Sequence, residues 1–163
     1  GFQKALDSDP SLHLYCIGDG PSEKEMKAHV KGQGLAENIH FLGRIENDEL
    51  LGTDLLSKHL AFVTMSNTEN QPMTIIEAMH KRLPIIGPRS RGITELINEN
   101  GILVNPDDTK QLAEALLKMK TDASMQKKMG KQSYDDSMKY NIQSIGAELD
   151  AFYDKVIAEK KKE

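Results

Sequence analysis

Short apolar runs alternate with segments of helical spacing along most of the chain. Turn-forming or polar residues follow each apolar run, and each run has the length of a strand; the runs are Leu12–Ile17, Ile39–Leu42, Leu60–Val63, Pro84–Ile86 and Ile102–Val104. The segments between them with helical spacing are Ser22–Gln33, Glu46–Lys58, Thr74–Arg82 and Ile93–Asn98. This alternation predicts an α/β fold, a Rossmann-like parallel sheet with helices on both faces.

Two of these helices carry further signals. Ser22 followed by Glu25 has the spacing of a capping box, which predicts a helix that opens at Ser22. Leucines at positions 50, 51, 55 and 56 form one broad apolar face. They predict a single helix over Glu46–Lys58.

The C-terminal part of the chain predicts helices only. Thr109–Met119 is amphipathic, and Asp122–Lys139 and Asn141–Glu159 are two further candidate helices. Their expected apolar anchors are Met125, Met129, Met138, Ile142, Ile145, Leu149, Phe152 and Val156. No strand follows, so we expect this tail to pack on the sheet or to reach toward a neighbouring domain. The closing lysines at 160–162 are expected to be the solvated end of the last helix.

The start of the chain indicates an incomplete sheet. Phe2–Asp7 is typical of the end of a helix, and Leu12 opens a strand. A doubly wound domain normally has a strand before such a helix. We therefore expect residues 1–121 to form a Rossmann-like domain that lacks its first strand, with residues 122–163 as C-terminal helices.

Composition narrows the classes of partner. The 163 residues suffice for one domain with a core. A net charge of −4 argues against a nucleic-acid partner, and an aromatic content of 5% argues against a base-stacking surface. The single cysteine, Cys16, cannot form an internal disulfide and fits a reducing compartment such as the cytoplasm. No apolar run approaches the roughly 20 residues that a membrane-spanning helix needs.

The segment that follows the third apolar run carries the candidate chemistry. Ligand sites of parallel sheets lie at the carboxyl ends of the strands. Pro72 favours a helix that starts at that residue. The amides of Met73, Thr74 and Ile75 would then lack partners within the helix, and such amides form an anion site.

Two glutamates flank this helix start. Glu69 lies in the loop before it, and Glu77 lies inside the helix on the same side as Thr74. Two carboxylates in these places can accept hydrogen bonds from hydroxyls on either side of a diphosphate, the arrangement that a nucleotide sugar offers. Acidic residues near a helix start also stabilise the macrodipole by about 0.3–1 kcal/mol without any ligand. Spacing alone leaves both interpretations open.

Glu69 and Glu77 form an E-x7-E pattern, with Pro72 between them and Ala78-Met79 after them. This pattern resembles the donor motif of glycosyltransferase family 4, the large retaining GT-B group. Other segments match the family in order and spacing: Ile17–Pro21, Asn38–Arg44, Leu83–Ile86, Gly92–Ile97 and Gly101–Asp108. The resemblance covers about Phe2 to Met119 closely and the tail loosely.

The resemblance implies a role for each matching position. Glu69, the candidate catalytic residue, would bind the hydroxyls of the donor sugar, and Glu77 would bind those of the ribose. The amides that follow Pro72, at Met73 and Thr74, would hold the diphosphate. The turn at Gly43 and Arg44 would lie along the nucleobase. Gly18 would let the chain pass close to the ligand, although a role as a simple turn residue is equally compatible with its position.

The resemblance also implies an activity for the full-length protein. It would transfer a hexose, with a UDP-sugar favoured as donor, to a glycan, lipid or small-molecule acceptor, in bacterial cell-surface polysaccharide or glycolipid synthesis. The donor-binding domain would work with an N-terminal acceptor domain, without cofactor or metal. This chain alone would bind nucleotide and transfer no sugar. We expect it in the cytoplasm, where any association with the inner face of the membrane would come from parts outside this chain.

The chain departs from the family in places. The basic residues that neutralise the leaving diphosphate belong after the missing first strand, and Arg44, Arg89 and Arg91 are the cations left near the site. Glu23 stands where a dinucleotide fingerprint needs its third glycine, which argues against a dehydrogenase. The five histidines lack metal-ligand spacing. Two alternatives remain: a non-catalytic nucleotide-sugar binding module and a flavodoxin-like interaction domain.

Overall fold

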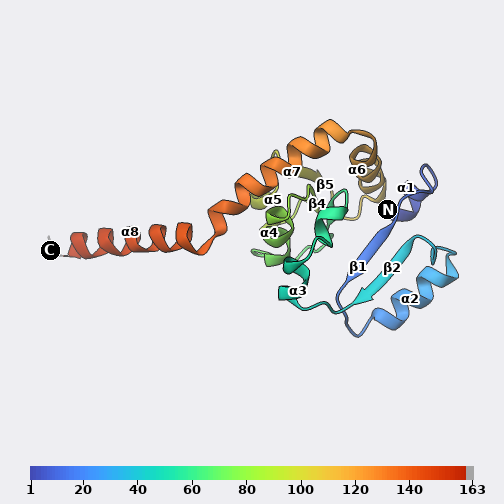
Figure 1. Cartoon of the computed structure of the whole chain (residues 1–163), viewed down its shortest axis with the longest axis horizontal. Coiled ribbons are helices and arrows are strands. Elements are labelled where there is room, and N and C mark those ends of the chain that lie inside the picture. Colours follow the sequence, from blue (N-terminus) through green and yellow to red (C-terminus); the bar gives the residue numbers. More distant parts are fainter. Residues whose placement is uncertain (161–163) are drawn as a thin grey trace.

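The computed structural model describes residues 1–160, and the lysines at 161 and 162 lie outside the described part. Helices and strands alternate up to residue 104, and only helices follow (Figure 1). The elements are α1 (Phe2–Leu6), β1 (Leu14–Ile17), α2 (Glu23–Gly32), β2 (Ile39–Gly43), α3 (Asn47–Gly52), the 3₁₀ turn η1 (Leu56–Lys58), β3 (Phe62–Val63), α4 (Met73–His80), β4 (Ile85–Pro88), α5 (Ile93–Leu96), β5 (Gly101–Val104), α6 (Thr109–Thr121), α7 (Ala123–Ser137), the 3₁₀ turn η2 (Met138–Tyr140) and α8 (Ile142–Lys160).

The strands pair only in parallel, which confirms the predicted α/β class. They form two sheets, β1–β2 and β3–β4–β5, where the sequence had predicted one. The prediction was a parallel sheet without its first strand, and in the structure β1 and β3 are not hydrogen-bonded to each other. Each of these two strands therefore has one edge with no partner strand among the described residues.

Helices cover both faces of the three-stranded sheet. Neighbouring residues of a strand point to opposite faces, and β4 shows this clearly. Ile85 belongs to a buried cluster with residues of α4 and α5, including Ile75 and Ile93. Ile86 belongs to a second cluster with Met119 of α6. Every residue of β4 is buried, as expected for the central strand of a covered parallel sheet.

Several helix boundaries differ from the prediction. The helix expected over Glu46–Lys58 is broken into α3 and η1, because Gly52 and Thr53 are poor helix formers and Thr53 adopts an extended conformation. The Thr53 hydroxyl instead accepts a hydrogen bond from the Leu55 amide at 3.4 Å. The capping box at Ser22 does not form, since Ser22 is itself in the α region and makes no side-chain cap.

The C-terminal helices divide into a packed and an exposed part. Met125 and Met129 of α7 pack against the cluster around Met119, as predicted. In contrast, α8 projects away from the rest of the chain (Figure 1), and its predicted anchors are exposed. Ile142, for example, is 82% exposed.

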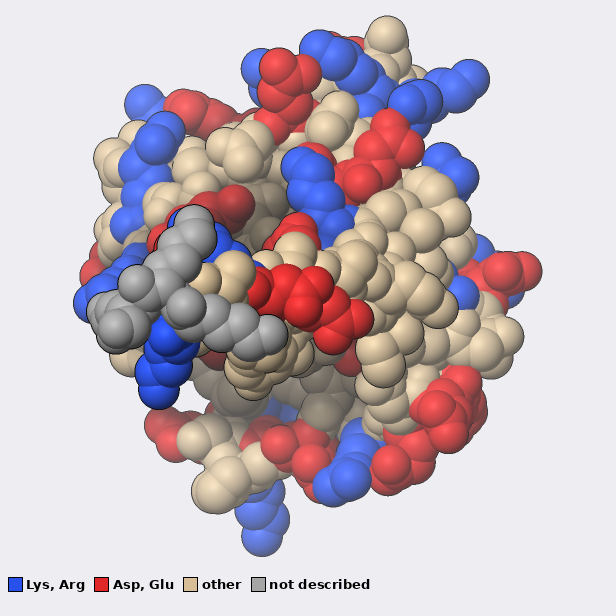
Figure 2. Space-filling model, turned by 90° about the vertical axis from the view of Figure 1, so that its left-hand side faces the viewer, with Lys and Arg blue, Asp and Glu red and all other residues tan. Residues whose placement is uncertain are grey.

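The surface charge is mixed. Seen from the end at which α8 projects, Lys and Arg side chains are interspersed with Asp and Glu side chains over the visible face (Figure 2). No helix of the described part is long and apolar enough to cross a membrane.

Candidate functional site

The predicted site residues lie at the carboxyl ends of the strands. Gly18 follows β1, Gly43 ends β2, and the segment that contains Glu69 follows β3. A hydrogen bond from Asn47 Nδ2, just after β2, to Glu77 Oε1 on α4 spans 3.1 Å. This bond joins the carboxyl ends of the two sheets, so the strand-end turns of both sheets share one edge of the molecule.

Gly18 and Gly43 lie together at the ends of β1 and β2. The Gly18 amide donates a hydrogen bond to the Gly43 carbonyl at 2.8 Å. Their φ angles, +120° and +70°, fall in a region that favours glycine. A Cβ atom at either position would meet nothing within 4 Å. Backbone conformation therefore requires the two glycines, and the open space beside them would let a ligand approach the chain.

The loop before α4 holds Glu69 in place. The Ser66 hydroxyl donates a hydrogen bond to Glu69 Oε1 at 3.0 Å. Gly92, just before α5, has a φ of +81°, and a Cβ there would overlap the carbonyl oxygens of Glu69 and Asn70. The close approach of this loop to Gly92 fixes the backbone that carries the Glu69 carboxylate.

The start of α4 differs from the prediction by one residue. Pro72 is the N-cap, with φ −70° and ψ 112°, and the helix begins at Met73. Because Pro72 stays extended, its carbonyl accepts a hydrogen bond from the Ile75 amide at 3.1 Å. The prediction of a free Ile75 amide was therefore wrong. The amides of Met73 and Thr74 are the pair left at the helix start, and both residues are exposed.

Glu77 and Arg44 are oriented by different partners. Glu77 is half-buried and bonded to Asn47, as described above. Arg44 forms an ion pair with Glu46, with 2.9 Å between Nε and Oε1, and both side chains are largely exposed. The Glu46 carboxylate therefore partly neutralises Arg44, one of the cations that the sequence places near the site. Arg89 and Arg91 are exposed nearby and have no carboxylate within 4.0 Å in the described part of the chain.

Sequence reasoning missed three contributors to this site. The contact of Asn47 with Glu77 joins positions 30 residues apart, which no local pattern reveals. Ser66 lies three residues before Glu69, and its role depends on how the loop folds. Gly92 was noted only as part of a matching segment. Its positive φ and its contact with the Glu69 loop require the three-dimensional structure.

A cavity of about 190 Å³ opens at this edge, lined by Met65, Asn67, Asp107, Asp108, Thr109 and Leu112. Ligand pockets usually measure about 300–1,000 Å³. The cavity is thus too small to enclose a nucleotide sugar by itself. Within residues 1–160, no group of three or more His, Cys, Asp or Glu side chains could hold a metal ion.

Comparison with known proteins identifies a matching family. The family model described as glycosyl transferases group 1 matches residues 2–136. A GDP-mannose-dependent alpha-mannosyltransferase of Corynebacterium glutamicum is 29% identical over 155 residues, covering 94% of this chain and 36% of the relative. The sulfoquinovosyl transferase SQD2 of Arabidopsis thaliana is 26% identical over 145 residues, covering 86% of this chain and 27% of the relative. The chain thus spans well under half the length of both relatives.

Solved structures show the same fold. The C-terminal domain of LpcC, a glycosyl transferase group 1 family protein of Francisella tularensis, superposes with a TM-score of 0.73 at 27% identity. That match covers 86% of this chain and 78% of the LpcC domain. Anabaena HepE in complex with UDP superposes with a TM-score of 0.81 at 20% identity, over 95% of this chain and 45% of HepE.

Proposed function

The chain belongs to the glycosyl transferases group 1 family, and from that premise we propose that it is the donor-binding domain of a retaining glycosyltransferase. The fold is one half of a GT-B architecture. The full-length protein would transfer a hexose from a nucleotide-diphosphate sugar to an acceptor. This chain would grip the nucleotide diphosphate as the leaving group, so that its contribution is positioning and electrostatic stabilisation.

One observation carries the proposal. Two carboxylates, each fixed by a hydrogen bond from a neighbouring side chain, flank a helix start whose first two amides have no hydrogen-bond partner in the described part of the chain. The amides of Met73 and Thr74 point out of the start of α4, where the helix dipole favours an anion. Glu69 is held by Ser66 on one side, and Glu77 is held by Asn47 on the other. Carboxylates that served only the helix dipole would need no such partners.

Each part of a nucleotide sugar has a counterpart in this arrangement. The diphosphate would accept hydrogen bonds from the Met73 and Thr74 amides. Glu69 would bind the sugar hydroxyls, and Glu77 the ribose hydroxyls. The glycine turn at Gly43, four residues before Asn47, would lie along the nucleobase.

The relatives bear on the choice of donor. One relative is named for GDP-mannose, and a structural neighbour was solved with UDP. We favour a UDP-sugar for this chain and a role in bacterial cell-surface polysaccharide or glycolipid synthesis. One relative named an exopolysaccharide phosphotransferase, from Streptomyces coelicolor, supports that role. No metal or cofactor is needed by this proposal, since the helix start and the glutamates supply the contacts.

A partner domain would complete the site. The cavity of about 190 Å³ at the strand-end edge needs a second wall to enclose a nucleotide sugar. An N-terminal acceptor domain of the same protein would supply this wall. The exposed apolar residues of α8, among them Ile142 and Phe152, suit contact with that domain. The isolated chain would then bind nucleotide and transfer no sugar.

The hydrogen-bond pattern also supports a missing strand between β1 and β3. The Leu14 amide bonds Asn38 on the β2 side at 2.8 Å, so the alternating Tyr15 amide faces the other side. On β3, the Phe62 amide bonds Pro84 on the β4 side at 2.9 Å, and the Val63 amide faces away from it. One parallel strand between the two open edges would join the sheets in the order typical of doubly wound folds.

Calorimetric titration of the chain with UDP, GDP and ADP tests the proposal. We expect one nucleotide to bind, and we expect Glu77→Ala to weaken binding by roughly tenfold, the effect of losing about 1.4 kcal/mol of hydrogen bonding to a charged group. Glu37→Ala is the control, because Glu37 is an exposed carboxylate just before β2 and so lies at the amino end of that strand, opposite the site. Equal affinities of the two variants would contradict the assigned role of Glu77.

A further inference from the structure

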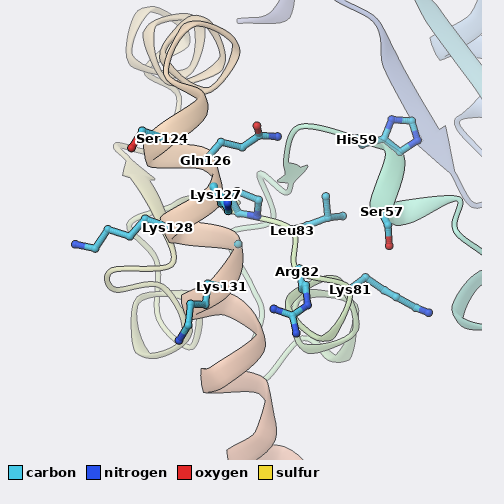
Figure 3. A pocket seen from close by; sticks show the side chains of 12 residues that line it. Ser57, His59, Lys81, Arg82, Leu83, Ser124, Gln126, Lys127, Lys128 and Lys131 are labelled. Atoms are coloured by element: carbon cyan, nitrogen blue, oxygen red, sulfur yellow. The ribbon is translucent and has the colours of Figure 1, made fainter.

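A second and larger cavity lies at the other edge of the sheet. Its volume is about 670 Å³, and it is lined by residues from three separate segments. These segments are the first half of α7, the turn from Lys81 to Pro84, and the stretch around His59 (Figure 3). Pro84 immediately precedes β4, and His59 precedes β3. The cavity therefore lies at the amino ends of strands, away from the proposed donor site.

The lining of this cavity is strongly basic. It includes five Lys or Arg residues and no acidic residue, in a chain whose acidic residues outnumber its basic ones by 25 to 21. Two of the five are neutralised at the rim: Lys128 lies 3.6 Å from a carboxylate oxygen of Glu99, and Lys131 lies 2.5 Å from one of Asp135. Figure 3 shows both of these lysines extending from the side of α7 opposite Gln126.

Three cations remain without a carboxylate partner. Within residues 1–160, Lys81, Arg82 and Lys127 have no Asp or Glu oxygen within 4.0 Å. They come from two segments that line the cavity, the turn after α4 and the first half of α7. In Figure 3 the Lys81 side chain extends from this turn away from α7, on the side of Ser57. Unneutralised cations around one concavity raise the local concentration of anions.

The turn that carries Arg82 is held rigidly. Its backbone has a φ of +61°, and its guanidinium stacks over the Tyr134 ring with 4.2 Å to the centroid. The Ser133 hydroxyl of α7 donates to the Leu83 carbonyl at 2.7 Å. A Cβ at Gly130 would overlap the Arg82 carbonyl oxygen, so α7 approaches this turn closely. The two basic walls are thus fixed relative to each other before any ligand binds.

Neutral polar groups and an apolar floor complete the hollow. His59 Nε2 is buried and has no hydrogen-bond partner in the described part. Ser57 and Ser124 are also among the lining residues. Leu83 and Pro84, both buried, form apolar surface between the basic walls. The hollow offers contacts to an anion with several acceptor oxygens and to the uncharged part of the molecule that carries it.

We propose that this cavity is a second anion site, which binds a phosphate group of a molecule larger than inorganic phosphate. A phosphate carries more charge than a carboxylate and accepts hydrogen bonds on three oxygens, which suits a cavity lined by several cations. The cavity volume leaves room for the remainder of the ligand. That remainder is either a soluble phosphorylated compound or the headgroup of an anionic lipid. The site is separate from the proposed donor site and does not depend on it.

NMR titration with inorganic pyrophosphate tests the soluble form. Pyrophosphate is also the central group of a nucleotide diphosphate, so it could bind at the donor site as well. The two sites are distinguished by their amides: those of Ser124 and Lys127 report this cavity, and those of Met73 and Thr74 report the donor site. We expect shifts at the first pair. The double variant Lys81→Glu/Lys127→Glu should weaken the response at Ser124 by roughly tenfold or more, through two lost ion contacts.

A matched control is Lys24→Glu/Lys31→Glu, which makes the same charge change on the exposed surface of α2. This variant should bind pyrophosphate at the cavity as the wild type does. Circular dichroism establishes that both variants are folded. An equal loss in the two variants would overturn the proposal, because it would show attraction to net charge alone.

Co-sedimentation with vesicles tests the lipid form. Phosphatidylcholine vesicles with and without phosphatidylglycerol are compared for the wild type and both double variants. If vesicle binding requires phosphatidylglycerol and is lost only in Lys81→Glu/Lys127→Glu, the ligand is a lipid headgroup. If pyrophosphate causes shifts and the chain does not bind vesicles, the ligand is a soluble phosphorylated compound. The proposal would be overturned if the wild type showed no vesicle binding and also no shifts at Ser124 and Lys127.

Discussion

Replacing Gly92 by alanine tests how the structure holds the loop that carries Glu69. Gly92 has φ +81° and ψ −39°, a combination that L residues rarely adopt and that costs them of order 1–3 kcal/mol. The added Cβ would also overlap the carbonyl oxygens of Glu69 and Asn70, so the loop would have to move. We expect Gly92→Ala to lower the free energy of unfolding by roughly 2–4 kcal/mol, the conformational cost plus the cost of the displaced loop.

Two other glycines separate these causes. Gly43 has a φ of +70°, and a Cβ added there would meet nothing within 4 Å, so Gly43→Ala should carry only the conformational cost of about 1–2 kcal/mol. Gly20 lies outside the left-handed region and also has open space around it. Gly20→Ala should leave stability unchanged or raise it by about 0.4–1 kcal/mol, through the unfolded state.

Urea denaturation followed by circular dichroism gives the three free energies of unfolding. The expected order of stability is Gly20→Ala, then Gly43→Ala, then Gly92→Ala. The nucleotide affinity of the Gly92 variant should also fall, because the displaced loop carries Glu69. A Gly92 variant as stable as the Gly43 variant would refute the claimed contact between Gly92 and the loop.

Three further predictions concern other parts of the chain. In hydrogen exchange of the isolated chain, the Tyr15 amide should exchange faster than the Leu14 amide, because only the latter pairs with β2; equal protection would contradict the open edge of β1. Burial lowers the pKa of His59 below its usual value of 6.5, so its neutral form is favoured in the folded state. The contribution of neutral His59 to the free energy of unfolding is therefore complete above pH 6.5 and is lost as the pH falls below that value. In urea denaturation, the free energy of unfolding should fall less on acidification in His59→Asn than in the wild type. An equal fall in the two proteins would contradict this. Burial raises the pKa of the Cys16 thiol, so iodoacetamide should alkylate Cys16 more slowly in the folded than in the urea-unfolded chain at one pH; equal rates would contradict this.

Local patterns predicted the turns and the helix start around the candidate site better than they predicted strand pairing. The start of α4 was placed within one residue, because proline restricts both its own φ and the residue before it. The glycine turns at Gly18 and Gly43 followed from residue type and their places after apolar runs. These features depend on a few neighbouring residues, and a sequence displays them directly.

Features that depend on distant contacts could not be predicted. The division into two sheets depends on which strands pair, and apolar runs carry no information on pairing partners. The break after Gly52 is a different case, because its cause is local: Gly52 and Thr53 are poor helix formers, and the prediction gave more weight to the broad apolar face. The same helical spacing predicted apolar anchors at Met125 and Ile142. Met125 packs against the core cluster, whereas Ile142 is exposed. Periodicity identifies an apolar face and leaves open what covers it.

The central claim is that the start of α4 binds the diphosphate of a nucleotide. NMR titration of the isotope-labelled chain with UDP, GDP and ADP tests it most directly, because amide resonances report the contact residue by residue. The account predicts that at least one nucleotide shifts the amides of Met73 and Thr74, and that Glu77→Ala reduces the affinity. Saturable shifts that exclude Met73 and Thr74, or no shift with any of the three nucleotides, would contradict it.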